Sequence, residues 1–131
     1  MTKIEHIALW VRDIEASRDF YVKYFGGAAG AGYTNPETDF QSFFVVFGEG
    51  ARLEIMQRPD TAQAKGAASG QETTGYSHIA FSVGSKEVVN RLTHWLIKDG
   101  YYLLGGPRTT GDGYYESLIL DPDGNRVEIT V

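Results

Sequence analysis

The sequence contains no cysteine, and this absence excludes three kinds of chemistry. Disulfide bonds, thiolate metal ligands and cysteine nucleophiles all require the missing side chain. A chain without cysteine also fits a reducing compartment, so we expect a cytoplasmic location.

The sequence also lacks a long apolar run and an excess of basic residues. No stretch of 18 consecutive apolar residues occurs, so we expect no membrane span. Residues 1–5 lead directly into a predicted strand and contain no signal-peptide core. The net charge is −5, with 17 acidic against 12 basic residues. Because phosphate binding usually needs a basic face, this balance argues against nucleic acid as a partner.

Two short motifs occur twice along the chain. His6-Ile7-Ala8 returns as His78-Ile79-Ala80, so the two histidines lie 72 residues apart (78 − 6). Arg52-Leu53-Glu54-Ile55 returns as Arg126-Val127-Glu128-Ile129, with the two glutamates 74 residues apart (128 − 54). The chain therefore consists of one module used twice, and each copy opens with a histidine strand and closes with a glutamate strand.

Each copy is predicted to have the element order β-α-β-β-β. Asp13 is a plausible N-cap of a helix that ends at Gly26, and Ser85 is one for a helix that ends at Gly100. The fold class is α+β, with two tandem modules forming a curved mixed sheet around a cleft and the helices outside. The predicted division is a first module at 1–58, a linker at 59–74 and a second module at 75–131.

Glycine and proline mark the predicted interruptions. Residues 59–74 are polar and rich in alanine, glycine and glutamine, which indicates an exposed linker, with a short helix as an alternative. Residues 105–113 are predicted to form a loop between strands at 101–104 and 114–120. Asp121-Pro122-Asp123-Gly124 is a strong turn signal, and turn chemistry explains it fully although it resembles part of a calcium loop.

The alternation of side chains places both histidines and both glutamates opposite the apolar faces of their strands. In the last strand, for example, Glu128 alternates with Val127 and Ile129. If helices cover the apolar faces, the four polar side chains point into the cleft. Two neutral imidazoles and two carboxylates suit a divalent metal ion, whose charge they would balance. A single such residue is usually just solvated, but four at duplicated positions favour a shared metal site: His6, Glu54, His78 and Glu128.

The remaining histidine and the aromatic residues of the first predicted helix have structural rather than functional interpretations. His94 has no counterpart in the first copy and lies on a predicted helix, so a surface position is expected. Four aromatic residues recur at helical spacing, which is typical of a helix that faces a core. They are Phe20, Tyr21, Tyr24 and Phe25.

Three features of the sequence resemble the vicinal oxygen chelate superfamily, the glyoxalase I and bleomycin-resistance group. They are the duplicated module, the His-Ile-Ala at the start of each copy, and the ending Asp-Pro-Asp-Gly-Asn-Arg-Val-Glu at 121–128. The resemblance covers essentially the whole chain. The order His, Glu, His, Glu is similar to that of bacterial glyoxalase I, whereas extradiol dioxygenases and fosfomycin-modifying transferases typically show two histidines and one glutamate. The resemblance implies nickel, cobalt or zinc as the cofactor and a homodimer with sites shared between chains.

The resemblance also implies an activity. Similar enzymes are lactoylglutathione lyases, which abstract a proton next to a carbonyl in a thiol–aldehyde adduct and stabilise an enediolate at the metal. Glu128 would be the base, and Glu54 would share or return the proton. The alternative is a small-molecule binding or resistance protein of the same superfamily that performs no chemistry. An oxygenase is a weaker alternative, because Glu54 fills a position that oxygenases occupy with another residue.

The substrate-binding positions depart from the glutathione-using pattern. Those relatives have an arginine four residues after the first histidine and an asparagine four residues after the first glutamate, where this chain has Trp10 and Arg58. Trp10 is expected to line an apolar pocket, and Arg58 is expected to contact a carboxylate. Arg108 is a further expected anion contact. The expected partner is a small molecule. The sequence identifies neither its thiol nor its aldehyde, and it does not decide whether the two modules pair within one chain or between two.

Overall fold

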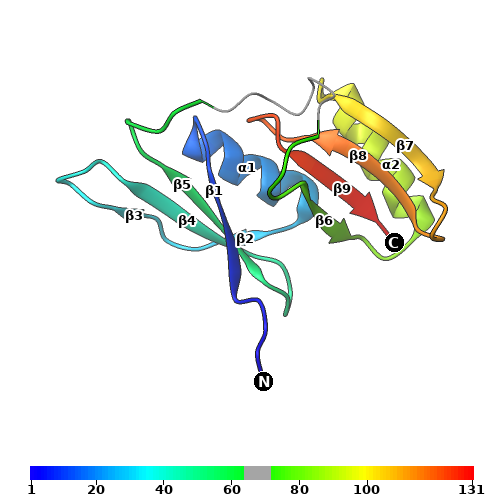
Figure 1. The fold of residues 1–131 in the computed structure, drawn as a ribbon, viewed down its shortest axis with the longest axis horizontal. Helices are drawn as coiled ribbons and strands as arrows, with labels where there is room; N and C mark the ends of the chain where they lie inside the picture. Colours follow the sequence, from blue (N-terminus) through cyan, green and yellow to red (C-terminus); the bar gives the residue numbers. More distant parts are fainter. Residues whose placement is uncertain (64–71) are drawn as a thin grey trace. The chain divides into compact units, whose positions relative to one another are not determined.

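The computed structural model describes residues 1–63 and 72–131. The chain divides into two compact units, Met1–Ala64 and Lys65–Val131. Each unit combines one helix with one mixed sheet (Figure 1). The middle of the predicted linker, residues 64–71, lies outside the described residues, and so does the short helix considered for it. The boundaries 1–58 and 75–131 stay a prediction.

The first unit contains a sheet with the strand order β1-β5-β4-β2, and β3 pairs with β4 beside β2. The His strand β1 runs parallel to the Glu strand β5, and the other pairs are antiparallel. The chain therefore adds one short strand, β3, to the predicted module. Its elements are β1 (His6–Trp10), α1 (Ile14–Phe25), β2 (Ala28–Ala29), β3 (Tyr33–Thr34), β4 (Gln41–Val46) and β5 (Arg52–Gln57).

Helix α1 begins and ends where the sequence predicts. The Asp13 side chain accepts a hydrogen bond from the Ala16 N–H at 3.0 Å, a contact that typically contributes about 1 kcal/mol. At the other end Gly26 adopts a left-handed conformation with φ of 68°. The helix packs against β4 and β5, so the predicted core role of its aromatic residues is confirmed. Its buried side chains are Ile14, Ser17, Phe20, Tyr21 and Tyr24, and Phe25 is half-buried.

The second unit repeats this arrangement with the strand order β6-β9-β8-β7. The His strand β6 runs parallel to the Glu strand β9, and the remaining pairs are antiparallel. Helix α2 is capped by Ser85, whose hydroxyl accepts from the Val88 N–H, and its His94 is exposed as expected. The elements are β6 (His78–Ser82), α2 (Lys86–Lys98), β7 (Leu103–Thr109), β8 (Tyr115–Leu120) and β9 (Arg126–Thr130).

The predicted loop at 105–113 is wrong for its first half, because β7 continues to Thr109. Strand β7 lies at the edge of its sheet, and its register with β8 shifts on both sides of Gly105. An edge strand with such irregularities tolerates the glycines and Pro107 that would interrupt a central strand. Gly106 has a φ of 81°, and a Cβ there would lie 2.5 Å from the Glu116 carbonyl oxygen. Only glycine fits this close approach.

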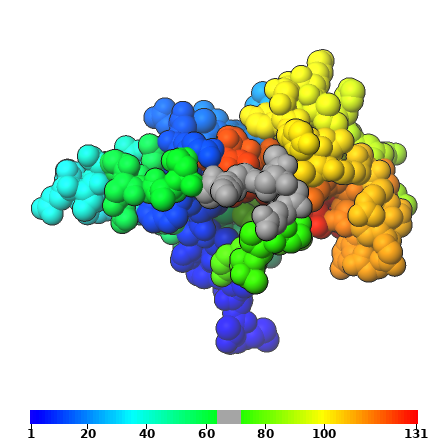
Figure 2. Space-filling view, turned by 45° about the horizontal axis from the view of Figure 1, so that its top comes forward, coloured from blue at the N-terminus to red at the C-terminus, as the bar shows by residue number. Residues whose placement is uncertain are grey.

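The glutamate strands and their neighbours β4 and β8 carry buried apolar residues of each sheet. Leu53 and Ile55 on β5, and Val127 and Ile129 on β9, are buried. On the edge strand β1, by contrast, Ile7 is 39% exposed. The N-terminal residues project away from the first unit, as the dark blue segment in Figure 2 shows. In the part of the chain that the structure describes, no helix is long and apolar enough to cross a membrane.

Candidate functional site

Parallel pairing of a His strand with a Glu strand builds the same side-chain arrangement in both units. In the first unit His6 lies opposite Arg52 in the register, and Glu54 follows two residues later on the same face of β5. The β6–β9 pair repeats this register with His78 and Glu128. Since residues two apart on a strand share a face, each imidazole meets the carboxylate of its own unit.

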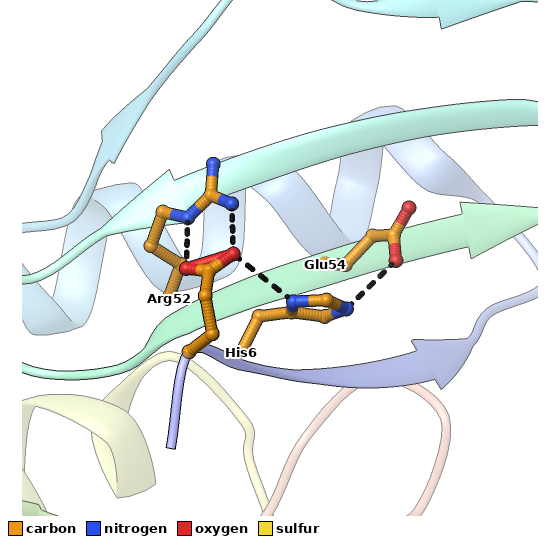
Figure 3. Close-up of polar contacts among 4 residues, drawn as sticks. His6, Arg52 and Glu54 are labelled. Carbon is orange, nitrogen blue, oxygen red and sulfur yellow. Dashed lines mark hydrogen bonds and ion pairs between the residues drawn. The ribbon is translucent and has the colours of Figure 1, made fainter. Parts of the chain in front are cut away.

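The structure brings each histidine together with its predicted carboxylate. His6 Nε2 lies 3.7 Å from Glu54 Oε1 (Figure 3), and His78 Nε2 lies 3.1 Å from Glu128 Oε2. The side chains of Glu54 and Glu128 are each 18% exposed, whereas those of the histidines are 41% and 38% exposed. Each pair thus holds a largely buried carboxylate beside a more accessible imidazole.

The donor atoms of each pair fit two neighbouring positions on one divalent ion. Ligand atoms about 2.1 Å from an ion and at right angles to each other are about 3.0 Å apart. The separation of 3.1 Å in the second unit is close to this value, and that of 3.7 Å in the first unit corresponds to a wider angle of about 120° at the ion. An imidazole nitrogen with a carboxylate oxygen suits nickel, cobalt or zinc. Among residues 1–63 and 72–131, no three or more His, Asp or Glu side chains form a group that could hold a metal. Each unit therefore offers two ligands.

In the first unit a second carboxylate contacts the other ring nitrogen of the imidazole. Glu5 Oε1 lies 3.2 Å from His6 Nδ1, while the Arg52 guanidinium donates to both carboxylate oxygens of Glu5 (Figure 3). The hydrogen bond from Arg52 lowers the pKa of Glu5 and, in turn, raises the pKa of Arg52. The Phe44 ring supports both neighbours, with the guanidinium carbon of Arg52 4.1 Å from its centroid and the His6 ring edge-on at 5.5 Å.

In the second unit the pair opens onto a cavity of about 370 Å³. Arg108, which the sequence indicates as an anion contact, lies on its wall, so three of the predicted site residues meet here. The apolar part of the wall comes mainly from β7 and β8. The lining residues are Glu72, Ser77, His78, Leu104, Gly105, Arg108, Glu116, Ser117, Leu118, Arg126 and Glu128.

Glu116 is a residue of this site that the sequence reasoning misses. Burial, together with the hydrogen bond and the charge of Glu116 and a smaller contribution from Asp112, raises the pKa of Glu128 to about 7. The β8–β9 hairpin is centred on Asp123 and pairs residue 118 with 128 and residue 116 with 130, which places Glu116 diagonally across from Glu128. A hairpin centred on the predicted turn at 121–124 would pair residue 117 with 128 instead, so the sequence carries no signal for this contact.

The raised pKa of Glu128 predicts a stability that falls as pH rises. Between about pH 4.5 and 7 the folded state keeps a proton on Glu128 that the unfolded chain has released. The free energy of unfolding of the metal-free protein should therefore decrease across this range, by up to about 3 kcal/mol from this group. Urea unfolding at a series of pH values measures this decrease. Glu128→Gln should flatten the decrease, and equal slopes in both proteins would contradict the assignment.

Trp10 and Arg58, the other predicted substrate contacts, lie together in the first unit. The guanidinium carbon of Arg58 is 5.3 Å from the centroid of the Trp10 ring, and its Nε donates to Asp60. Trp10 also contacts Phe40 edge-on at 6.0 Å. It lies on the same face of β1 as His6 but four residues further along, about 13 Å away at the usual rise of a strand. The structure thus places these two residues beside each other at the far end of β1.

A sequence model of the Glyoxalase/Bleomycin resistance protein/Dioxygenase superfamily matches residues 3–129. The match spans nearly the whole chain, including both His strands and both Glu strands. The chain therefore belongs to this superfamily, as the sequence resemblance implies.

Relatives with similar extent support the same fold. An uncharacterized protein, YqjT of Bacillus subtilis, is 28% identical, and the alignment covers 96% of each chain. The trypanothione-dependent glyoxalase I of Leishmania major superposes with a TM-score of 0.77 at 21% identity, covering 99% of this chain and 86% of that one. A glyoxalase family protein from Enterococcus faecalis gives a TM-score of 0.78 at 23% identity, covering 98% and 97%. The predicted α+β fold of two tandem modules is confirmed.

Proposed function

We propose that the protein is a metal-dependent lyase or isomerase of the glyoxalase I type, acting on a thiol–aldehyde adduct. The observation that carries this proposal is the duplicated His–Glu pair, in which each imidazole nitrogen and carboxylate oxygen lie 3.1–3.7 Å apart. Members of the superfamily generally use divalent metals, which supports the same interpretation.

Four side chains are proposed to hold one nickel, cobalt or zinc ion: His6 and Glu54 from a first unit, and His78 and Glu128 from a second unit. The two units belong either to one chain or to two chains of a homodimer with shared sites. A bound divalent ion supplies Lewis-acid stabilisation of the negative charge that develops on a substrate oxygen. The homodimer and the cytoplasmic location remain predictions.

Glu128 is the proposed base. Its burial and its contact with Glu116 bring its pKa to about 7, so it can both accept and release a proton near neutral pH. In its ionised form it takes the proton from the carbon next to the carbonyl. Glu54 occupies the equivalent position in the other module, and its side chain is equally buried, which makes it the proposed group that shares or returns the proton.

The substrate is proposed to enter the cavity of the second unit. Its volume of about 370 Å³ falls within the range of small-molecule sites. Leu104 and Leu118 offer it apolar contacts, and Arg108 offers a guanidinium that suits a carboxylate of the thiol. Trp10 and Arg58 are retained as proposed contacts for a second part of the substrate, an aromatic face with a neighbouring cation.

An assay with methylglyoxal and several thiols tests this proposal. Protein reconstituted with nickel, cobalt or zinc should form a thioester from methylglyoxal and at least one thiol, glutathione among those tried. A chelator should abolish the activity, because the residues alone lack the charge to stabilise the intermediate, and metal should restore it. If metal-loaded protein is inactive with every thiol, yet binds a small molecule equally well with and without chelator, the non-enzymatic binding or resistance protein is favoured instead.

A further inference from the structure

We propose that Glu5 is a positioning residue that fixes the His6 imidazole with its bare Nε2 turned toward the metal position. A neutral imidazole carries its single proton on either ring nitrogen, and only the nitrogen without the proton can bind a metal ion. Which nitrogen is bare is decided by the hydrogen bond that the other makes. The inference rests on the proposed function, in which His6 is a ligand.

The distances around the His6 ring favour one tautomer. Glu5 Oε1 lies 3.2 Å from Nδ1, whereas Glu54 Oε1 lies 3.7 Å from Nε2. An ionised carboxylate only accepts hydrogen bonds, so the contact with Glu5 requires the proton on Nδ1. A separation of 3.7 Å is too long for a hydrogen bond, so Glu54 does not compete for that proton. Nε2 is left bare on the side of Glu54.

Glu5 is itself held in place by Arg52 on β5. The Arg52 guanidinium donates to both of its carboxylate oxygens, and the Arg52 backbone N–H donates to the Glu5 carbonyl at 3.0 Å. The same guanidinium lies over Phe44, against which the His6 ring packs edge-on. These contacts connect four side chains, so the carboxylate cannot turn away from Nδ1 without breaking its bonds to Arg52.

Among residues 72–131 of the second unit, a hydroxyl instead of a carboxylate contacts the corresponding imidazole nitrogen. There the atom behind the imidazole is the Ser77 hydroxyl, 3.0 Å from His78 Nδ1. A hydroxyl both donates and accepts, so Ser77 does not dictate where the proton lies. Arg126, which occupies the register position of Arg52, pairs with Glu72. A carboxylate behind a ligating imidazole fixes its orientation and raises its basicity. His6 is therefore the better oriented of the two imidazole ligands.

Glu5→Ala tests the inference, and Glu72→Ala is its matched control. Both substitutions remove a carboxylate from an arginine at the same register position, and so remove the same charge. The first readout is ¹⁵N NMR of the His6 ring in the metal-free protein at about pH 8.5, about two units above the ordinary imidazole pKa. The wild-type protein and Glu72→Ala should show the Nδ1–H form, and Glu5→Ala should show a mixture in which Nε2–H is populated. A His6→Gln spectrum assigns the signals.

The second readout is nickel affinity, measured by competition with a chelator. Loss of a partner behind a metal ligand typically weakens binding 10–100-fold, and about 10-fold is expected for Glu5→Ala because the contact is exposed. Glu72→Ala removes a charge from the cavity wall of the second unit but no partner of an imidazole, so its loss of affinity should be smaller than that of Glu5→Ala. The inference is overturned if Glu5→Ala keeps the wild-type tautomer, or if it binds nickel as tightly as the wild-type protein does. If the wild-type protein binds none of nickel, cobalt and zinc, the proposed function fails, and the NMR comparison still decides the role of Glu5.

Discussion

Glu128→Gln is expected to lower the turnover of the metal-reconstituted protein by on the order of 10²–10⁴-fold, the usual worth of a general base. An amide cannot accept the proton from carbon, although it nearly matches the carboxyl group in shape. The fold should survive, because the raised pKa of Glu128 means that this position already accommodates a neutral group at moderately acid pH. Steady-state kinetics gives the loss, and circular dichroism checks the fold.

Glu116→Gln is the matched control for this experiment. It makes the same substitution in the same cavity, next to Glu128, but it leaves the proposed base in place. Turnover should remain, and the acid limb of its pH profile should move to lower pH, because the neighbouring charge that raises the pKa of Glu128 is gone. Wild-type turnover in Glu128→Gln would remove Glu128 as the base.

Removing either predicted imidazole ligand is expected to produce the largest loss of metal binding. His6→Ala and His78→Ala each remove one of the four proposed ligands. Loss of a group that only hydrogen-bonds to a ligand weakens metal binding by up to about 100-fold, so loss of a ligand itself should lower nickel affinity by more than that. Both variants should fail in the same way although the two residues lie in different modules. Isothermal titration or chelator competition measures the affinity.

His94→Ala is the control of the same residue type. His94 is exposed on α2 and has no counterpart in the first module, so its removal should leave nickel affinity unchanged. A loss in His94→Ala equal to that in His78→Ala would show surface binding rather than a built site. Loss in only one of the two ligand variants would restrict the site to one module.

The repeat in the sequence is sufficient to predict most of the fold. Two His strands and two Glu strands at matching offsets establish two modules, and the caps at Asp13 and Ser85 define where the helices begin. Strand β7 could not be predicted at its full length, because glycine and proline at 105–107 read as a loop. The edge position and the shifted register that tolerate them arise only from the folded sheet.

The candidate site was predictable for residues that alternate on strands and not for the residues that support them. His6, Glu54, His78 and Glu128 follow from alternation and duplication. Glu5 does not follow from these patterns, because it lies before the first residue of β1. Its hydrogen bonds to Arg52, and not the alternation of a strand, direct its side chain toward His6. The sequence also does not distinguish modules that pair within one chain from modules that pair between two, since both bring together the same residue types.

The number of ions bound per chain tests most directly whether two His–Glu pairs hold one ion. Metal-free protein is titrated with nickel to saturation, excess ion is removed, and bound metal and protein are quantified by mass spectrometry. One ion per chain is expected, whether the two pairs come from one chain or from two. Two ions per chain would mean that each pair binds alone, and a chain that retains no nickel, cobalt or zinc would contradict the metal site altogether.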